Sequence, residues 1–492
     1  MSSPETNNIE ITVFVGLFLF VTLLGFVAAR WKPGDLRMLD EWGLGGRRFG
    51  IAITWFLVGG DLYTAYTIIA VPALVYSVGA YGFFAIPYAI IIYPLVFATM
   101  PRLWEVCQRD GHLTAADFVQ GRYHNGGLAL AVALTGLVAT MPYIALQLVG
   151  IQVVLGQLGL GHGDLPLIVA FLILAVYTYT SGLRAPAMIA FAKDIMIYVV
   201  VLAAVLVIPV KLGGYGPVFE AAEKVLQAKG GNAGLTLKPA QMLPFASLAL
   251  GSALALFMYP HSVTGILSSS SARAIRWNAI LLPAYTVLLG LVALLGYMAI
   301  AHGIKVANPN EVVPALFNHI FPGWFAGFSL AALAIGALVP SAIMSIGAAN
   351  LFTRNIWKPL IRPQISPEEE ATIAKIVSFI VKLGALIFII FLPTEYAIDL
   401  QLLGGILMLQ VFPCVVLGLY RWPVRGSALL LGWFAGIAFG ICFFVLAGLK
   451  PVFAIRAFGS VFAVYSGILA LVINLAVCLG SSLISLRLAK RG

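Results

Sequence analysis

About thirteen stretches of roughly twenty mostly apolar residues run along the chain, and this repetition constrains the fold more than any other sequence feature. They span residues 11–31, 51–79, 81–100, 127–158, 164–180, 187–211, 243–268, 277–302, 324–353, 373–392, 398–420, 427–447 and 460–486. Backbone groups in lipid must bond within their own segment, and the sequence lacks the alternating strands of a membrane barrel. We therefore predict an all-α membrane protein with about 13 transmembrane helices, in which residues 1–492 form a single membrane domain.

The net charge of +10 at pH 7 is compatible with a nucleic-acid partner, but its distribution argues for a membrane. With the N-terminus outside, most lysine and arginine residues between the predicted helices fall on the cytoplasmic side. Positive charge marks that side of membrane proteins. We therefore predict a multi-pass protein of the inner (plasma) membrane, with the N-terminus outside and the C-terminus cytoplasmic. Lipid is an expected partner and nucleic acid is not, and a monomer is the working expectation.

Two of the predicted helices are interrupted in the middle. The first contains FLVGGDLYTAYTIIAVPALVY (56–76), in which Asp61 directly follows a glycine pair, and the second contains FMYPHSVTG (257–265). The two interruptions lie five predicted helices apart. Such paired breaks are typical of two inverted repeats with a binding site between the broken helices. The alternative is a proline kink without function, which membrane helices tolerate.

Short stretches along nearly the whole chain resemble the sodium:solute symporter family. They are LGGRRFG (44–50), PALVYSVGA (72–80), LTAADFVQGRY (113–123), PYIALQLVG (142–150), SGLRAP (181–186), YPHSVTG (259–265) and ANLFTRNIW (349–357). Their order along the chain, more than any single stretch, carries the resemblance. Within the family, the chain looks most like the bacterial monocarboxylate permeases, which take lactate, pyruvate and related short acids.

The resemblance implies a leucine-transporter-type fold with two inverted repeats of five helices, one extra N-terminal helix and two extra C-terminal helices. On this chain, the peripheral first helix is 11–31, the repeats are 51–211 and 243–420, and the last two helices lie in 427–486. The family implies a secondary symporter that imports small organic acids by alternating access. It needs no cofactor beyond a coupling cation, H⁺ or Na⁺. The alternative is a conventional sodium-coupled symporter for an amino acid or another small organic solute.

The family's common sodium site does not transfer completely to this chain. The resemblance assigns two backbone carbonyls at the first break to Gly60 and Tyr63, and a third carbonyl to Gly336. The two hydroxyl ligands of the family fall on Val339 and Pro340, whose side chains contain no oxygen. Sodium is a hard cation that requires oxygen ligands, by the logic that holds for other hard ions. The hydroxyl half of the site is therefore missing, unless a shift in register brings in Ser341 or, one turn on, Ser345.

A charged pair inside the segment 187–211 points to a different coupling ion. Asp194 matches an acidic residue of the family, and it directly follows Lys193. A lysine in a span costs on the order of 3 kcal/mol on insertion scales, and such residues usually pair or relay protons. Lys193 can place its ammonium where sodium would sit, near Gly60 and held by Asp61 or Asp194, and release a proton from there. The alternative is that its long side chain reaches the cytoplasmic surface.

Polar residues near the two breaks are the candidates for substrate binding. They are Tyr63, Thr64, Tyr66, Thr67, Gln147, His261 and Gln410. For most of them, a hydrogen bond between helices is the competing interpretation, and for His261 it is a structural bond to backbone groups freed at the break. Lys382, in the segment 373–392, has no assigned role; neutralising an acid such as Asp194 is one option.

A membrane enzyme is the competing class of function. The sequence contains no HExxH, GxSxG or Walker A pattern, and its six histidines are scattered. We therefore expect neither enzymatic activity nor a metal centre. No soluble receptor domain and no channel-filter repeat is evident either.

Overall fold

The computed structural model describes residues 4–31, 34–160, 165–391, 397–457 and 459–489. The α-helices are α1 (Pro4–Val27), α2 (Leu39–Leu44), α3 (Ile51–Gly60), α4 (Val71–Val78), α5 (Ala85–Ile91), α6 (Tyr93–Asp110), α7 (Ala115–Tyr123), α8 (Gly126–Gln157), α9 (Leu165–Ser181), α10 (Arg184–Lys211), α11 (Tyr215–Lys229), α12 (Pro239–Leu256), α13 (Pro260–Leu267), α14 (Ala272–Leu281), α15 (Pro283–His302), α16 (Val312–Ile320), α17 (Gly323–Phe352), α18 (Pro367–Phe391), α19 (Ala397–Leu409), α20 (Phe412–Leu419), α21 (Gly426–Leu446) and α22 (Ser466–Ala489). Short 3₁₀ or π turns are η1 (Ala28–Arg30), η2 (Gly45–Arg47), η3 (Tyr66–Ala70), η4 (Ala80–Phe84), η5 (Pro309–Glu311) and η6 (Thr353–Ile361).

The helical membrane class is confirmed. The part of the chain that the structure describes supports about ten membrane spans, fewer than the thirteen that the sequence predicts. Among the described residues, 10 helices are long and apolar enough to cross a membrane, or up to 11 when a bent pair, 80–91 with 93–110, counts as one span. Shorter apolar helices occupy Ile51–Gly60, Tyr66–Val78 and Leu165–Ser181. Every predicted apolar segment contains helix, but the count of thirteen crossings and the two inverted repeats stay predictions.

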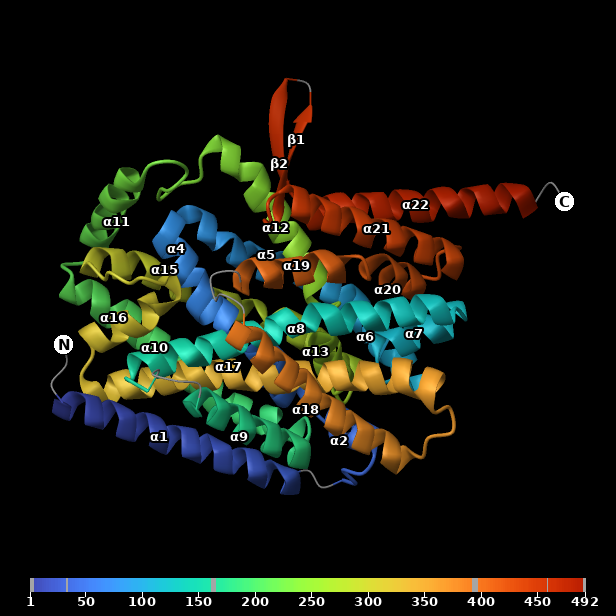
Figure 1. Ribbon diagram of the computed structural model, residues 1–492, viewed down its shortest axis with the longest axis horizontal. Coiled ribbons are helices and arrows are strands. Elements are labelled where there is room, and N and C mark those ends of the chain that lie inside the picture. Colours follow the sequence, from blue (N-terminus) through green and yellow to red (C-terminus); the bar gives the residue numbers. More distant parts are fainter. Residues whose placement is uncertain (1–3, 32–33, 161–164, 392–396, 458, 490–492) are drawn as a thin grey trace.

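A β-hairpin is the element that the hydropathy pattern did not predict. Strands β1 (Val452–Ala457) and β2 (Ser460–Tyr465) pair antiparallel, with Val452 opposite Tyr465. The predicted helix 460–486 therefore begins only at Ser466. An apolar strand and the start of an apolar helix have similar hydropathy, so composition does not separate them. The hairpin projects beyond the helices at the top of Figure 1.

Both predicted helix breaks are present. Helix α3 ends at Gly60, and regular structure resumes only near η3. Helix α12 ends at Leu256, and α13 begins at Pro260, which lacks the backbone N–H needed to continue a helix. The two broken segments also lie side by side, because the backbone of Phe49 pairs with Ser268 and Ser270. The site described below therefore forms where two helices expose backbone groups next to each other.

Helix α17 is the central element against which both breaks pack. It runs across the molecule between α8 and α1, with α18 crossing in front (Figure 1), and it also contacts α10 and α13. Residues 329–351 of this helix are all buried. At Gly347, a side chain would collide with the backbone of Pro260 and His261. This glycine allows the second break to approach α17 closely.

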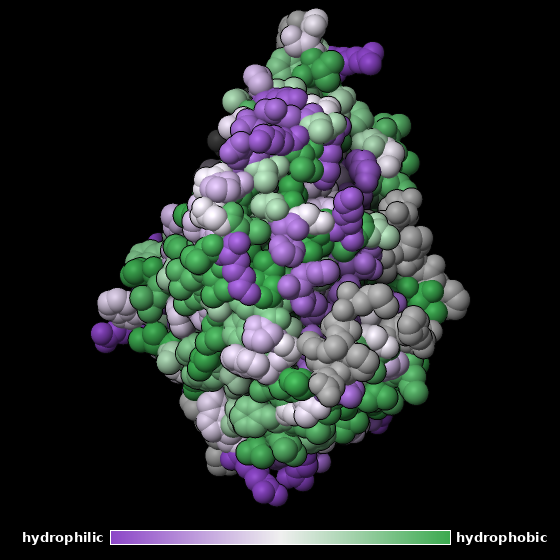
Figure 2. All heavy atoms as spheres, turned by 90° about the vertical axis from the view of Figure 1, so that its left-hand side faces the viewer, coloured by the Kyte–Doolittle hydropathy of each residue, from purple (hydrophilic) through white to green (hydrophobic). Residues whose placement is uncertain are grey.

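The start of α1 and the end of α22 lie toward opposite ends of the long axis in Figure 1. The face at the α1 end is shown in Figure 2, where hydrophilic residues gather over α11 and hydrophobic residues cover much of the flanks. Exposed polar residues of α11 include Glu220, Glu223 and Lys224. This polar cap over an apolar body is expected for the end of a membrane protein that meets water.

Candidate functional site

The first break contains a buried lysine bound to an opened carbonyl. The ammonium of Lys193 on α10 donates a hydrogen bond to the backbone oxygen of Gly60, where α3 ends. Its Nζ also lies 3.1 Å from Oδ1 of Asp194, and both side chains are completely buried. Lys193 therefore does not reach the surface, as the alternative required. It binds the same carbonyl that the family resemblance assigned to sodium.

Tyr285 on α15 completes this cluster, and the sequence analysis did not identify it. Its hydroxyl donates to Oδ2 of Asp194 at 2.8 Å. Its backbone oxygen accepts from the Tyr63 hydroxyl at 3.0 Å, so Tyr63 points toward α15. No local sequence signal marks Tyr285, because a tyrosine in an apolar helix usually only packs. The cluster is an acid between two donors, Lys193 and Tyr285, in a site without water access.

The glycine pair at the break has a steric reason. A Cβ on Gly60 would lie 2.9 Å from both Nζ of Lys193 and Oδ2 of Asp194. A Cβ on Gly59 would collide with the ring of Tyr285. These two positions are therefore closed to larger residues, because any side chain would displace the lysine–aspartate cluster or the tyrosine that holds it.

Helix α17 presents an apolar surface to the first break. A Cβ on Gly336 would lie 2.8 Å from Ile68, just beyond the break. At about 100° per residue, Val339 and Pro340 lie within about 60° of Gly336 on the helix surface. Val339 and Pro340, where the resemblance predicts the hydroxyl ligands, thus lie on the same side of α17 as Gly336. Their side chains contain no oxygen.

The hydroxyls of the two serines that were the alternative sodium ligands form hydrogen bonds within α17 and to α18. Ser345 lies about 180° around α17 from Gly336, and its hydroxyl donates to the Ala342 carbonyl and accepts from Ser378 of α18. The hydroxyl of Ser341 donates to the Ala337 carbonyl within its own helix. The placement of Ser345 at the ion position is therefore corrected, because its side of α17 packs against α18.

Lys382 lies at the contact between α17 and α18. Its ammonium lies 3.0 Å from Oγ of Ser378, which in turn bonds Ser345. The option that Lys382 neutralises Asp194 is wrong, because the acid is held by Lys193 and Tyr285. The two buried lysines thus lie in different contacts of α17.

The second break brings an acid and a histidine together. Nε2 of His261 lies 3.5 Å from Oδ2 of Asp61, and the side chains are 1% and 9% exposed. Oδ1 of Asp61 and Nδ1 of His261 have no hydrogen-bond partner. The histidine ring packs against Tyr143 and Tyr259, at centroid distances of 5.5 and 5.3 Å. The sequence identified Asp61 and His261 separately, and their pairing comes only from the fold.

Four tyrosines line a buried cavity beside this pair. The cavity is lined by Tyr66, Tyr88, Tyr143, Ser252, Ala255, Leu256, Tyr259, Gln401, Leu402 and Gly405. These residues come from η3, α5, α8, α12, α19 and the turn before α13. We call this space the tyrosine cavity. Of the predicted substrate residues, only Tyr66 lines it, and His261 lies one ring behind its wall.

Two of the other predicted substrate residues, Gln147 and Thr67, bond to the opened backbone. Oε1 of Gln147 accepts from the Ala65 backbone at 2.8 Å, and Oγ1 of Thr67 accepts from the Thr64 backbone at 3.0 Å. Oγ1 of Thr64 is buried without a partner. Gln147 and Thr67 thus satisfy backbone groups that unwinding exposes. Their roles in substrate binding stay predictions.

Gln410 faces away from both breaks. Its Nε2 donates to the Ile406 carbonyl at 3.0 Å, and its Oε1 accepts from Asn474 of α22 at 3.1 Å. These bonds join α19 to the C-terminal helix. None of these hydrogen bonds supports the prediction that Gln410 contacts the substrate, which stays a prediction.

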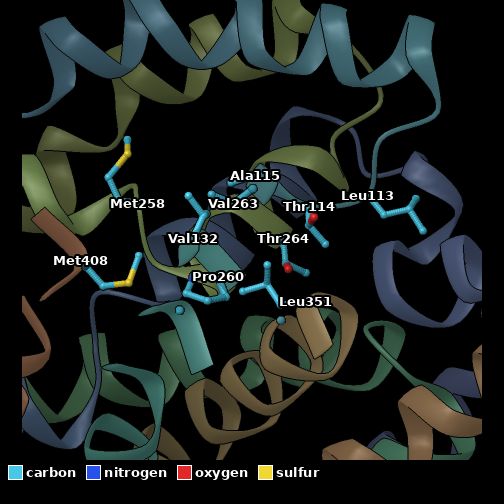
Figure 3. Close-up of a pocket in the computed structure, with 12 residues that line it drawn as sticks. Leu113, Thr114, Ala115, Val132, Met258, Pro260, Val263, Thr264, Leu351 and Met408 are labelled. Carbon is cyan, nitrogen blue, oxygen red and sulfur yellow. The ribbon is translucent and has the colours of Figure 1, made fainter. Parts of the chain in front are cut away.

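A second cavity lies on the other side of Pro260. Figure 3 shows Leu113 and Thr114 at one end of it, Met258 and Met408 at the other, and Pro260 and Val263 between them. Figure 3 also shows Thr264 pointing into this space. Tyr259 and Pro260 are consecutive residues that line different cavities. The second break therefore lies between two internal spaces.

A polar network closes the end of this second cavity that carries Thr114. The Thr114 hydroxyl donates to Oδ1 of Asn355 at 2.7 Å, and Nδ2 of Asn355 donates to Oδ1 of Asp117 at 2.7 Å. Arg354 lies 3.5 Å from Asp117 and 3.1 Å from Glu370, so it links the α7 end to the start of α18. These residues lie on the predicted cytoplasmic side. The network joins α7, η6 and the start of α18 at this end of the cavity.

We expect Asp117→Ala to open the second cavity from this side. The change removes the acceptor of Asn355 and one partner of Arg354, and a shift of about 1 kcal/mol changes the open population about fivefold. Thiol labelling of a Thr264→Cys reporter in inverted vesicles should therefore accelerate about fivefold. Asp110→Ala is the control, because Asp110 pairs only with its exposed neighbour Arg109. Equal labelling rates in the two variants would mean that the network does not hold this end closed.

Comparison with known proteins identifies the same family as the short sequence stretches. The model of the sodium:solute symporter family matches residues 42–436. A protein of Rhizobium johnstonii named monocarboxylate transport permease protein is 60% identical over 476 residues, which cover 96% of each chain. The uncharacterized symporter YodF of Bacillus subtilis is 35% identical over 440 residues, covering 88% of this chain and 87% of YodF.

A solved structure shares the fold. It is a Na⁺-coupled sialic acid symporter in a substrate-bound, outward-open state, with a TM-score of 0.78 and 16% sequence identity. The match covers 97% of both chains. At this identity the similarity concerns the arrangement of helices alone.

Proposed function

Because this chain belongs to the sodium:solute symporter family, we propose that it imports small monocarboxylates such as lactate and pyruvate by alternating access, with the proton as the coupling ion. We further propose that it acts in the plasma membrane with its N-terminus outside, as the lysine and arginine distribution predicts. The relative named a monocarboxylate transport permease supports the class of substrate. The cluster at Gly60 supports the ion.

The hydrogen bond from Lys193 to the Gly60 carbonyl is the observation that carries the proposal of proton coupling. A protonated lysine supplies one positive charge at the place where a sodium ion would supply it. Asp194, 3.1 Å away, balances that charge inside the protein. Loss of the proton removes the positive charge and leaves a neutral amine, which bonds the carbonyl and Asp194 more weakly. The cluster therefore differs in charge between its two states, as it would between sodium-bound and empty states. That difference is what a coupling ion must produce.

The tyrosine cavity supports a small acid as the substrate. Its described lining contains no lysine or arginine, so the carboxylate would be held by hydroxyl groups instead of a buried cation. The hydroxyl groups of Tyr259 and Ser252 in this lining can donate hydrogen bonds to the two oxygens of a carboxylate. Asp61 and His261 lie directly behind the Tyr143 and Tyr259 rings. A second proton site close to the substrate is thereby available.

We expect uptake to respond to a pH step and not to a sodium step. In proteoliposomes without sodium, an inward proton gradient of one unit should accumulate lactate up to about tenfold if one proton moves with each substrate. A sodium gradient at constant pH should leave accumulation near the equilibrium value. A strict requirement for sodium would instead support the alternative, a conventional sodium-coupled symporter, and would contradict the assignment of Lys193.

We expect short monocarboxylates to stabilise the purified protein against heat more than other solutes do. A ligand at one hundred times its dissociation constant adds about 2.7 kcal/mol to the stability of the folded state. Lactate and pyruvate should therefore raise the unfolding temperature measurably, whereas proline and glucose should not. Stabilisation by proline or glucose alone would contradict the proposed substrate class.

A further inference from the structure

Three buried polar atoms of the tyrosine cavity have no hydrogen-bond partner. They are Oη of Tyr259, Oγ of Ser252 and Oε1 of Gln401. Tyr259 is 3% exposed and Gln401 is 9% exposed, so bulk water does not reach them freely. Buried polar atoms are nearly always paired, so unpaired ones at a cavity require a partner that enters the cavity, either water or a ligand.

These three atoms differ in whether they can donate a hydrogen bond. The hydroxyls of Tyr259 and Ser252 can donate, which suits the two oxygens of a carboxylate. Oε1 of Gln401 only accepts, so its partner must be a group of the ligand that donates a hydrogen bond. A carboxylate at neutral pH has no such group. The donor must therefore stand elsewhere on a small acid, next to the carboxylate.

We propose that the tyrosine cavity selects monocarboxylates with a hydrogen-bond donor at carbon 2, the 2-hydroxy acids, and that Gln401 determines this preference. The proposal rests on the proposed function, because it assumes that a monocarboxylate occupies the cavity. The 2-hydroxyl of lactate donates to Gln401. Pyruvate has a 2-oxo group that only accepts, and propionate has no polar group at carbon 2. Both leave Oε1 of Gln401 without a donor from the ligand.

The test is competition among three acids of equal chain length in proteoliposomes. Uptake of labelled lactate is measured against unlabelled lactate, pyruvate and propionate in wild-type protein. We expect lactate to compete about tenfold better than propionate or pyruvate, the value of about one hydrogen bond. In Gln401→Met, which keeps the length of the side chain without its acceptor, the three acids should compete equally. The ratio between acids needs no correction for the amount of folded protein.

Two further variants separate selectivity from general damage. Leu402→Met changes an apolar residue of the same wall, and the tenfold ratio should remain. Ser252→Ala removes a donor for the carboxylate that all three acids share, so all three should weaken alike. Wild-type protein that takes up none of the acids would overturn the proposed function together with this inference. Uptake without a preference for lactate, or a preference that survives Gln401→Met, would overturn the inference alone.

Discussion

Lys193→Ala is expected to abolish accumulation driven by a proton gradient while exchange of substrate across the membrane continues. The change removes the ammonium that bonds the Gly60 carbonyl and leaves Asp194 with Tyr285 as its remaining partner. Without a group that binds the proton in one state and releases it in the other, the gradient has no effect on substrate movement. A pH step of one unit should then give an accumulation ratio near one instead of up to about ten.

The measurement is lactate uptake with a pH step, beside counterflow of labelled lactate at equal pH on both sides. Lys382→Met is the matched control, because it also removes a buried lysine but one that bonds Ser378 on the other contact of α17. That variant should keep its response to pH. Wild-type accumulation in Lys193→Ala would show that the lysine is structural, and would leave Asp61 as the remaining candidate for the proton.

Gly60→Leu is expected to reduce transport by about two orders of magnitude without preventing insertion into the membrane. Any side chain at this position would clash with Lys193 and Asp194, because even its Cβ would lie 2.9 Å from Nζ of Lys193 and Oδ2 of Asp194. Overpacking of this kind typically costs 1–3 kcal/mol, and about 2.7 kcal/mol corresponds to a hundredfold change. Leucine itself is apolar and favours helix, so the chain should still enter the bilayer.

Transport rate and surface expression are measured together for this variant. Gly16→Leu on α1 is the control, because nothing lies within 4 Å of the added Cβ there. Asp61→Asn extends the test by removing the charge that faces His261, and it too should lose transport. If Gly60→Leu and Asp61→Asn both transport at the wild-type rate, the first break is not the transport site.

Local features of the sequence were sufficient for several predictions. Hydropathy identified the membrane class, and Gly60 and Pro260 marked helix breaks, because a missing side chain or a missing N–H acts on the residue's own turn. The family indicated by the short motifs is confirmed over residues 42–436. Substrate, coupling ion, terminal orientation and inverted repeats stay proposals.

Other features could not be predicted, because they depend on which faces of distant helices meet. Lys193 reaches a carbonyl 133 residues earlier in the chain, and Tyr285 joins the same cluster from a third helix. Ser345 faces α18, and Gln410 faces α22, although both were plausible at the breaks from their position in the sequence. A rotation of about 100° per residue moves a side chain from one neighbour to another, so small changes of register decide its partners.

The sequence by itself determined that this chain crosses a membrane many times, that two helices break, and that Val339 and Pro340 have no side-chain oxygen where the resemblance predicts two hydroxyl ligands. Each of these follows from the identity of single residues in their own helix. Only the tertiary structure decided that the lysine binds Gly60, that Asp61 meets His261, and that Gln401 lines the tyrosine cavity. The physical reason is that burial and hydrogen bonding of a polar side chain in a helical bundle depend on the neighbouring helix, and neighbours are set by packing of the whole bundle.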